Sequence, residues 1–471
     1  MAELNAALAK LRKTVGPKGW LDSPDAMRPY LEERRGLFES QAAAVVCPAN
    51  TDEVAAVVKI CHQSGIGIVP QGGNTGLCGG AVAADRQILL NLRRMDRIRA
   101  VDTANDTITV EAGCLLAEVQ RAAEQANRLF PLSIAAEGSC QIGGNLATNA
   151  GGHNVLRYGN MRDLTLGVEV VLPDGRIWNG LSALRKDNTG YDLRHLFIGS
   201  EGTLGVITAA VLKLFPALRQ RVTAFAAVSA PATAMRLLET LQRATGQSVT
   251  SFELICRRAL DFVFSTIPQT RDPLDTPSSW YLLIEVGTSG DDSGLEAIVE
   301  NILADALEAG DLADAVLATS DSQRADFWRL RDSIPEAQRK VGASIKHDVS
   351  VPLSQVPTFL ERATAAVTAV DSRVRVCPFG HVGDGNIHFN LSQPVDMDGQ
   401  AFIQAWADYN RIVHDIVHEL GGSVSAEHGI GQLKIAEMAR YKDPVALALM
   451  HAIKRALDPD RIMNPGKILP D

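Results

Sequence analysis

A glycine-rich stretch that directly follows an apolar strand sets the fold of the first part of this chain. It reads Gln71-Gly72-Gly73-Asn74-Thr75-Gly76, after the apolar run Gly65-Ile66-Gly67-Ile68-Val69-Pro70. Such a loop can present several backbone N–H groups in one concavity, which suits a pyrophosphate. The spacing matches neither the Rossmann G-x-G-x-x-G nor a P-loop. On this segment alone, a phosphate-binding loop and an ordinary glycine turn are equally good interpretations.

Two further glycine clusters favour the phosphate-binding interpretation. One is Glu137-Gly138-Ser139-Cys140-Gln141-Ile142-Gly143-Gly144-Asn145, continued by Thr148-Asn149-Ala150-Gly151-Gly152. The other is Gly199-Ser200-Glu201-Gly202-Thr203-Leu204-Gly205. Because glycine lets the backbone approach a ligand closely, three clusters in one region predict a cofactor site.

Composition limits the possible functions. The chain has 471 residues and a net charge of −9, which argues against nucleic-acid binding but allows an anionic substrate held by local cations or a metal. No apolar run is long enough to predict a membrane span, and the first twenty residues do not form a signal peptide. The seven cysteines include no Cys-x-x-Cys pair, which argues against an iron–sulfur site. Dispersed thiols fit a reducing compartment, so we expect a cytoplasmic protein.

The order of predicted elements indicates an α+β protein. Short strands and helices alternate over residues 43–216, with a strand at 43–46, a helix capped by Thr51 and a hairpin around Pro173-Asp174-Gly175. After Pro216, strands alternate with longer helices, which suggests helices packed on one face of an antiparallel sheet. We predict one domain over 1–216, a second over 217–425 and a small helical C-terminal segment over 426–471.

A second motif, Gly380-His381-Val382-Gly383-Asp384-Gly385-Asn386-Ile387-His388, points to a metal site. Its glycines favour a turn, and a four-residue loop would pair Val382 with Ile387 and make His381 face His388. Cross-strand Cβ atoms lie about 5 Å apart, which suits two imidazoles on one ion. Glu427 would be the third ligand and leave positions open for a substrate. The alternative is a pair of surface or hydrogen-bonding histidines.

His414 and His418 form a rival metal pair. They lie at i and i+4 on a predicted helix, a spacing that places both on one face. No glutamate of the metalloprotease type separates them, and no glycine opens space around them. We therefore interpret them as part of a helix face.

The order of the glycine clusters, closed by Asn464-Pro465-Gly466-Lys467, resembles the FAD-binding (PCMH-type) domain of the vanillyl-alcohol oxidase superfamily. Within it, the chain resembles the D-2-hydroxyglutarate and D-lactate dehydrogenase group from about residue 43 to the C-terminus. The resemblance implies an FAD domain over 1–216, a substrate (cap) domain with the metal site over 217–425, and a return to the FAD domain over 426–471. It assigns FAD contacts to Pro70, Gly72, Gly73, Asn74, Thr75, Gly76, Gly138, Ser139, Gly143, Gly144, Thr148, Gly151, Glu201, Gly202, Ile207 and Asn464.

The same resemblance implies a reaction. A D-2-hydroxy acid, such as D-2-hydroxyglutarate or D-lactate, would be oxidised to the 2-oxo acid by hydride transfer to flavin. His381, His388 and Glu427 would bind zinc, or else manganese or iron, and His428 would be the general base. Arg331, Lys346 and Asn390 match substrate-binding positions, although Arg331 alone could equally be a helix-surface charge.

Several further expectations follow from the resemblance. No histidine lies between Pro70 and Gly80, so we expect non-covalent FAD. Relatives pass electrons to electron-transfer flavoprotein or quinone, and we expect a homodimer. Pro335 stands where the hydroxyglutarate enzymes tend to have threonine, which leaves the identity of the acid open. The alternatives are a metal-dependent hydrolase with structural glycine loops, and a flavoprotein subunit of a larger redox complex.

Overall fold

The computed structural model describes residues 2–291 and 294–470, which form two compact units. Unit 1 contains the chain up to Gly151, Gly159–Ala217 and the chain from Glu427 onward. Unit 2 contains Gly152–Tyr158 and Leu218–Ala426. The short segment Gly152–Tyr158 thus belongs to unit 2, although the sequence placed it in the first predicted domain.

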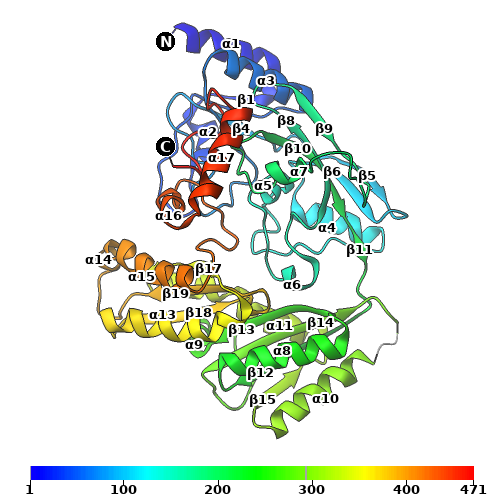
Figure 1. Cartoon of the computed structure of the whole chain (residues 1–471), viewed down its shortest axis with the longest axis vertical. Coiled ribbons are helices and arrows are strands. Elements are labelled where there is room, and N and C mark those ends of the chain that lie inside the picture. The colour runs from blue at the N-terminus through cyan, green and yellow to red at the C-terminus, as the bar shows by residue number, and fades with distance from the viewer. Residues whose placement is uncertain (1, 292–293, 471) are drawn as a thin grey trace. The chain divides into compact units, whose positions relative to one another are not determined.

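Unit 1 begins with a mostly parallel four-stranded sheet. Helices α1 (Ala2–Val15) and α3 (Thr51–Gln63) lie side by side and share an apolar core with this sheet (Figure 1). The cap of α3 is Asn50, whose side chain accepts from the N–H of Glu53, so the predicted Thr51 cap is wrong. The strands in sheet order are β1 (Trp20–Leu21), β2 (Ala44–Val46), β4 (Ile88–Asn91) and β3 (Ile68–Gln71).

A second sheet of unit 1 has five antiparallel strands, with β10 at its centre. The Pro-Asp-Gly turn joins β8 to β9, as predicted. The strands in sheet order are β5 (Ile98–Asp102), β6 (Thr107–Glu111), β10 (Val206–Lys213), β8 (Thr165–Val171) and β9 (Ile177–Gly180), and β7 (Arg128–Leu129) pairs with β11 (Phe215–Pro216). The other helices of unit 1 are η1 (Pro17–Gly19), α2 (Pro24–Leu31), α4 (Leu116–Gln125), α5 (Ile142–Ala147), α7 (Arg194–Phe197), α16 (Ile435–Tyr441) and α17 (Pro444–Leu457).

Unit 2 is built on an antiparallel sheet of eight strands. The strands in sheet order are β15 (Leu312–Leu317), β12 (Gln220–Val228), β14 (Trp280–Thr288), β13 (Val249–Cys256), β18 (Arg375–Gly380), β19 (Asn386–Ser392) and β16 (Ser344–Ile345), and β17 (Asp348–Ser350) also pairs with β19. Together with the unit 1 sheets and their helices, this sheet confirms the predicted α+β class.

Helices cover both faces of this sheet, so the predicted single helical layer is wrong. One apolar core joins the sheet to α8 (Pro231–Thr245), α10 (Leu295–Glu308), α13 (Val356–Val370) and α15 (Trp406–Glu419). The other core joins it to α9 (Arg257–Thr266), α11 (Asp321–Asp332) and α12 (Ile334–Lys340). The physical reason is that β13 and β14 are buried continuously rather than at alternate residues, so both of their faces need a cover.

The segment Gly152–Tyr158 is anchored in unit 2 by its backbone and by α6 (Val155–Tyr158). Ser251 Oγ on β13 donates to the carbonyl of His153 over 3.0 Å, and the Arg157 guanidinium donates to the carbonyl of Gly287. The remaining elements of unit 2 are η2 (Leu353–Gln355), η3 (Val382–Asp384) and α14 (Gly399–Gln404).

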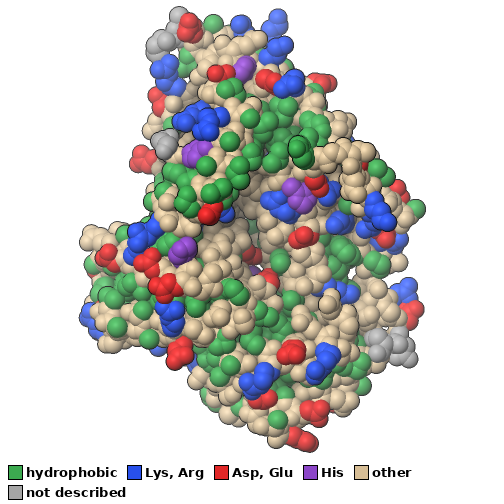
Figure 2. All heavy atoms as spheres, in the orientation of Figure 1, with side chains coloured by type: hydrophobic (Ala, Val, Ile, Leu, Met, Phe, Trp, Pro, Cys, Tyr) green, Lys and Arg blue, Asp and Glu red, His purple; other side chains and the backbone are tan. Residues whose placement is uncertain are grey.

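The surface shown in Figure 2 carries basic and acidic side chains interspersed on both units. Such mixing fits the modest net charge of −9. Within residues 2–291 and 294–470, no helix is long and apolar enough to cross a membrane.

Candidate functional site

The first two glycine clusters of unit 1 touch each other. A Cβ added to Gly73 would lie 2.0 Å from the Ser139 carbonyl oxygen, a distance that no side chain can tolerate. A Cβ added to Gly72 would lie 3.4 Å from the backbone nitrogen of Gly144. Glycine at position 73 is therefore required for the close approach of two backbone loops that are far apart in sequence.

Side chains hold the first loop in place from outside. Asn91 Nδ2, on β4, donates to Gln71 Oε1 and to the Gly72 carbonyl, each over 3.0 Å. Asn74 has a left-handed backbone with φ of 53°, and its amide donates to the carbonyl of Glu32 over 2.8 Å. These bonds hold the loop through side chains that come from outside it.

The third cluster meets the C-terminal part of unit 1. The Glu201 carboxylate accepts from the N–H groups of Ile430 and Gly431 over 2.7 and 2.8 Å, and burial raises its pKa. Asn464 Nδ2 donates to the carbonyls of Gly80 and Glu201 over 2.9 and 2.7 Å. Asn464 therefore ties the chain end to the loops on which the predicted FAD contacts lie.

These loops fit a polar ligand such as FAD. In the described part of the chain, Asn464 Oδ1 and Gln141 Oε1 are buried without a hydrogen-bond partner, which is costly unless a ligand or water supplies one. Both atoms belong to the glycine-loop region, as do the open positions at Gly76, Gly138 and Gly144, where an added Cβ would meet nothing within 4 Å. The other predicted contacts lie on the same loops, at the end of β3 (Pro70), in or next to α5, or on β10, where Ile207 is buried.

The metal motif of unit 2 is a hairpin formed by β18 and β19. The predicted pairing of Val382 with Ile387 is wrong, because residues 382–384 form η3 and His388 pairs with Phe379 instead. The rings of His381 and His388 nevertheless lie 5.5 Å apart between centroids, nearly perpendicular to each other. The 3-10 turn after His381 shifts the strand pairing relative to the predicted hairpin. The two imidazoles are therefore close, but with a strand register that the sequence did not reveal.

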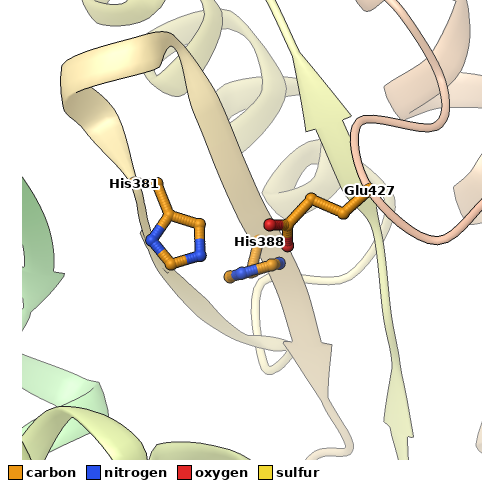
Figure 3. Close-up of side chains that lie close together, drawn as sticks. All are labelled: His381, His388 and Glu427. Carbon is orange, nitrogen blue, oxygen red and sulfur yellow. The ribbon is translucent and has the colours of Figure 1, made fainter. Parts of the chain in front are cut away.

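Glu427 joins these two histidines. One ligand atom from each of His381, His388 and Glu427 lies within 4.8 Å of the other two, and Figure 3 shows the three side chains converging (Figure 3). Glu427 is one peptide bond past Ala426, whose N–H donates to the Asp348 carbonyl of β17 over 3.2 Å. This backbone bond holds Ala426, the residue before Glu427, against β17.

A fully buried carboxylate supports this cluster. Glu253 Oε1, on β13, lies 2.6 Å from His381 Nδ1, and its Oε2 accepts from Arg331 Nε over 2.6 Å. Burial alone would raise the pKa of Glu253, but the neighbouring charges of His381 and Arg331 hold it well below its usual range. Arg331 is 4% exposed, so it is not the surface charge that its helix pattern also allowed.

Two further acidic and basic groups surround the hairpin. His388 Nδ1 lies 3.8 Å from Asp348 Oδ1, and Asn386 Nδ2 donates to the same carboxylate over 3.0 Å. Asp348 also forms a second close group with Glu427 and His428, whose ligand atoms lie within 4.8 Å of one another. The predicted base His428 is therefore next to a buried carboxylate as well as to a predicted metal ligand.

His153 packs on the other side of His381, with ring centroids 5.2 Å apart. Burial and the positive charges of His381 and Arg331 lower the pKa of His153 to about 3. The imidazole of His153 is thus neutral at physiological pH and adds no charge beside the predicted metal ligands.

The remaining predicted residues differ in burial: Asn390 is buried, whereas Lys346 and Pro335 are exposed. Asn390, on β19, accepts from the N–H of His347 over 3.2 Å and donates to Gln338 over 2.8 Å. Lys346 is exposed between β16 and β17, and Pro335 is exposed at the start of α12. The rival residues His414 and His418 differ in burial, since only His414 is buried, and neither joins a metal-like group within the described residues.

Sequence reasoning missed Glu253, Asp348 and His153. Only a partial signal existed for Glu253: an acid among apolar neighbours in a strand needs a charged or hydrogen-bonding partner if the strand is buried, but the sequence does not say which partner. No comparable signal marks His153, which lies in a loop far before His381 in the chain.

Comparison with known proteins shows the family of this chain. Residues 42–180 match the model of an FAD binding domain, and residues 217–468 match the C-terminal domain of FAD linked oxidases. The chain belongs to the family of FAD-linked oxidases. As a member of this family it is an FAD-dependent oxidoreductase, which confirms the predicted enzyme class and FAD. A metal-dependent hydrolase does not fit this family.

Relatives within the family extend over nearly the whole chain. A probable mitochondrial D-2-hydroxyglutarate dehydrogenase from Oryza sativa subsp. japonica is 36% identical over 98% of this chain and 81% of its own length. A D-2-hydroxyglutarate dehydrogenase from Xanthomonas citri is 37% identical over 90% of this chain and 89% of its own. A D-2-hydroxyglutarate–pyruvate transhydrogenase from Saccharomyces cerevisiae is 31% identical over 95% and 90%. The predicted resemblance is confirmed.

Solved structures support the fold. The FAD-linked oxidase chain superposes on p-cresol methylhydroxylase with a TM-score of 0.79 at 18% identity, over 99% of this chain and 97% of the other. Alkyldihydroxyacetonephosphate synthase gives 0.74 at 18% identity, over 98% and 86%. These similarities confirm the PCMH-type architecture.

Proposed function

We propose that this enzyme oxidises a D-2-hydroxy acid to the 2-oxo acid, with FAD as electron acceptor and a divalent ion at His381, His388 and Glu427. The observation that carries the proposal is the convergence of two imidazoles and a carboxylate beside a buried arginine. A group of metal-binding side chains suits a substrate hydroxyl. The Arg331 cation, which shares the Glu253 carboxylate with His381, suits a neighbouring substrate carboxylate. The relatives named D-2-hydroxyglutarate dehydrogenases support the same substrate class.

The donor set fits a zinc ion, with manganese or iron as the alternatives. Two histidines and one carboxylate give three protein ligands and leave coordination positions for a substrate. When bound, FAD supplies a two-electron acceptor, and the ion supplies a Lewis acid that lowers the pKa of a coordinated hydroxyl. We assign FAD, held without a covalent bond, to the glycine loops of unit 1 and to Asn464.

Arg331 would hold the carboxylate of the substrate. Its Nε donates to Glu253, whereas its two Nη groups have no hydrogen-bond partner in the part of the chain that the structure describes. A buried guanidinium with a free edge suits a carboxylate, which accepts two parallel hydrogen bonds. Lys346 and Asn390 would be additional substrate contacts, and Asn390 already has its amide oriented by His347 and Gln338.

His428 would remove the hydroxyl proton. Imidazole is suited to proton transfer near neutral pH. His428 follows Glu427 directly, and its ring lies within reach of the Asp348 carboxylate, which can orient the ring and stabilise its protonated form. Under this proposal the base would be the second residue after the chain passes from unit 2 back into unit 1.

D-2-hydroxyglutarate and D-lactate differ by a second carboxylate, and the exposed Pro335 offers no hydroxyl for it. Within this proposal, electrons leave through electron-transfer flavoprotein or a quinone, and the enzyme is a homodimer in the cytoplasm. Several relatives are named mitochondrial, so fractionation of the native cell is the direct check of location.

The test of this proposal is an anaerobic screen of paired D- and L-2-hydroxy acids for bleaching of the bound flavin. We expect D isomers to bleach the flavin and to form the matching 2-oxo acid, and L isomers to leave it oxidised. Bleaching by L isomers, or by none of the acids, would contradict the proposed function. Turnover of the isolated chain with a dye acceptor would separately exclude a non-catalytic redox subunit.

A further inference from the structure

We infer that Glu253 is a positioning residue that orients a metal ligand and the substrate-binding arginine at the same time. The inference rests on the proposed function, because it concerns the same site. Neither the family match nor the sequence motifs point to Glu253. It lies on β13, 128 residues before His381 in the chain, and is not among the predicted metal ligands or substrate-binding residues.

The contacts of Glu253 are divided evenly between its two oxygens. Oε1 lies 2.6 Å from His381 Nδ1, and Oε2 lies 2.6 Å from Arg331 Nε. The Glu253 side chain has no exposed surface, while those of His381 and Arg331 are 8% and 5% exposed. Since short charge-assisted bonds between buried groups fix geometry strongly, all three side chains should move as one rigid unit.

The contact with His381 sets the tautomer of its ring. A carboxylate can only accept, so His381 Nδ1 must carry the hydrogen, and when the ring is neutral Nε2 keeps the lone pair that a metal requires. A carboxylate behind a metal-bound histidine also increases its basicity as a ligand. Glu253 thus prepares His381 to bind through Nε2.

The contact with Arg331 sets the direction of the guanidinium. Because Nε is held by Glu253, the two Nη atoms of the planar group are left to donate to another acceptor. The guanidinium carbon lies 5.0 Å from the centre of the Phe379 ring, which fixes the plane from a second side. Phe379 pairs with His388 across the hairpin, so the same strands carry a second metal ligand and this support.

The competing explanation is a purely structural buried ion pair. Under that explanation Glu253 only neutralises Arg331, and its loss would lower stability without a specific effect on metal or substrate. Glu285 offers a matched control on the neighbouring strand β14. It is also buried, but it accepts from Trp328 Nε1 and Thr223 Oγ1 and has no contact with His381 or Arg331 in the described structure.

The experiment compares Glu253→Gln with Glu285→Gln in the full-length flavoprotein after removal of metal by a chelator. Zn²⁺ affinity is measured by competition with a chromophoric chelator, and KM for the best D-2-hydroxy acid is measured in excess zinc. We expect Glu253→Gln to weaken zinc binding about 10- to 100-fold and to raise KM by a similar factor. Glu285→Gln should leave both values within about twofold of wild type.

A second pair of variants guards against a misfolded Glu253→Gln protein, in which the Arg331 charge has no partner. Arg331→Met should raise KM but keep the zinc affinity, because the Glu253–His381 contact remains. The double variant Glu253→Gln/Arg331→Met has no unpaired charge and should lose zinc affinity as well. A double variant that binds zinc as tightly as Arg331→Met would overturn the role of Glu253 toward His381.

The outcomes also separate this inference from the proposed function. Wild-type protein that binds no stoichiometric zinc, manganese or iron would overturn the metal site, and the role of Glu253 toward it. Wild-type protein that binds the ion and oxidises D-2-hydroxy acids, while Glu253→Gln retains wild-type zinc affinity and KM, would overturn the inference alone.

Discussion

The two proposed binding regions, the glycine loops of unit 1 and the hairpin of unit 2, use different chemical groups. The glycine loops of unit 1 offer backbone, and side chains such as Asn91 hold that backbone from outside. The hairpin of unit 2 offers two imidazoles, and Arg331 of α11 adds a guanidinium; the carboxylates of Glu253 and Asp348 contact these groups from behind. Added side-chain atoms should therefore disrupt FAD binding by the glycine loops. Loss of side-chain groups should disrupt catalysis and substrate binding at the hairpin.

The largest effect is expected from removal of the proposed base in the second region. His428→Ala should lower turnover about 10²- to 10⁴-fold, because a positioned general base contributes a factor of that size. The glycine loops are unchanged, so the variant should keep its full flavin content. Flavin absorbance and stopped-flow reduction measure both quantities. His418→Ala, at an exposed position of α15, is the control and should behave as wild type; reduction of the His428 variant at the wild-type rate would disprove the assignment.

Addition of a single methyl group tests the first region. Gly73→Ala should lose most of its FAD and about 1–3 kcal/mol of stability, because the new Cβ would meet the Ser139 carbonyl oxygen. Flavin content after gel filtration and thermal unfolding are the measurements. The matched control is Gly290→Ala, where the nearest atom to an added Cβ is Thr288 Oγ1 at 3.5 Å. Equal flavin content in the two variants would mean that the two loops are not held together as the structure shows.

A conservative change in the second region should have an intermediate effect. Arg331→Lys keeps the positive charge but loses the flat, two-pronged donor, so KM should rise about tenfold with a smaller change in kcat. Arg329→Lys is the control, since Arg329 lies two residues away on the exposed side of α11. Steady-state kinetics measure KM for both variants. Equal KM values would contradict the role of Arg331 in binding the substrate carboxylate.

The smallest effect concerns the closing segment of unit 1. Burial lowers the pKa of Lys467 from 10.5 to about 8. Folding then disfavours the charged form, so this residue destabilises the protein below pH 8, and the penalty fades as the pH rises toward 10.5. Lys467→Met should be more stable than wild type at pH 7 by on the order of 1 kcal/mol. Urea unfolding at several pH values should show this advantage shrinking above pH 8, and a constant difference would contradict it.

The two regions also differed in how far the sequence revealed them. The glycine loops could be located from the sequence because glycine marks this backbone residue by residue, while their individual FAD contacts stay a prediction. Their mutual contact could not, since the approach of Gly73 to Ser139 depends on how two separate loops pack. The strand at 43–46 and the turn between β8 and β9 are similarly local, and both are present.

The hairpin region was predicted in part. The turn between His381 and His388 predicts that the two residues are close. It does not predict the register of the strands, because three of the intervening residues form η3. The support from Glu253 could not be predicted, since it depends on β13 lying beside β18 in the sheet. The placement of His153 next to His381 likewise depends on the segment Gly152–Tyr158 joining unit 2.

The measurement that bears most directly on the central claim is the anaerobic reduction of flavin by a D-2-hydroxy acid in protein with and without its metal. The account predicts that chelation leaves FAD bound but stops bleaching, and that added Zn²⁺ or Mn²⁺ restores it. Bleaching at the same rate in metal-free protein would show that the hairpin cluster takes no part in the reaction.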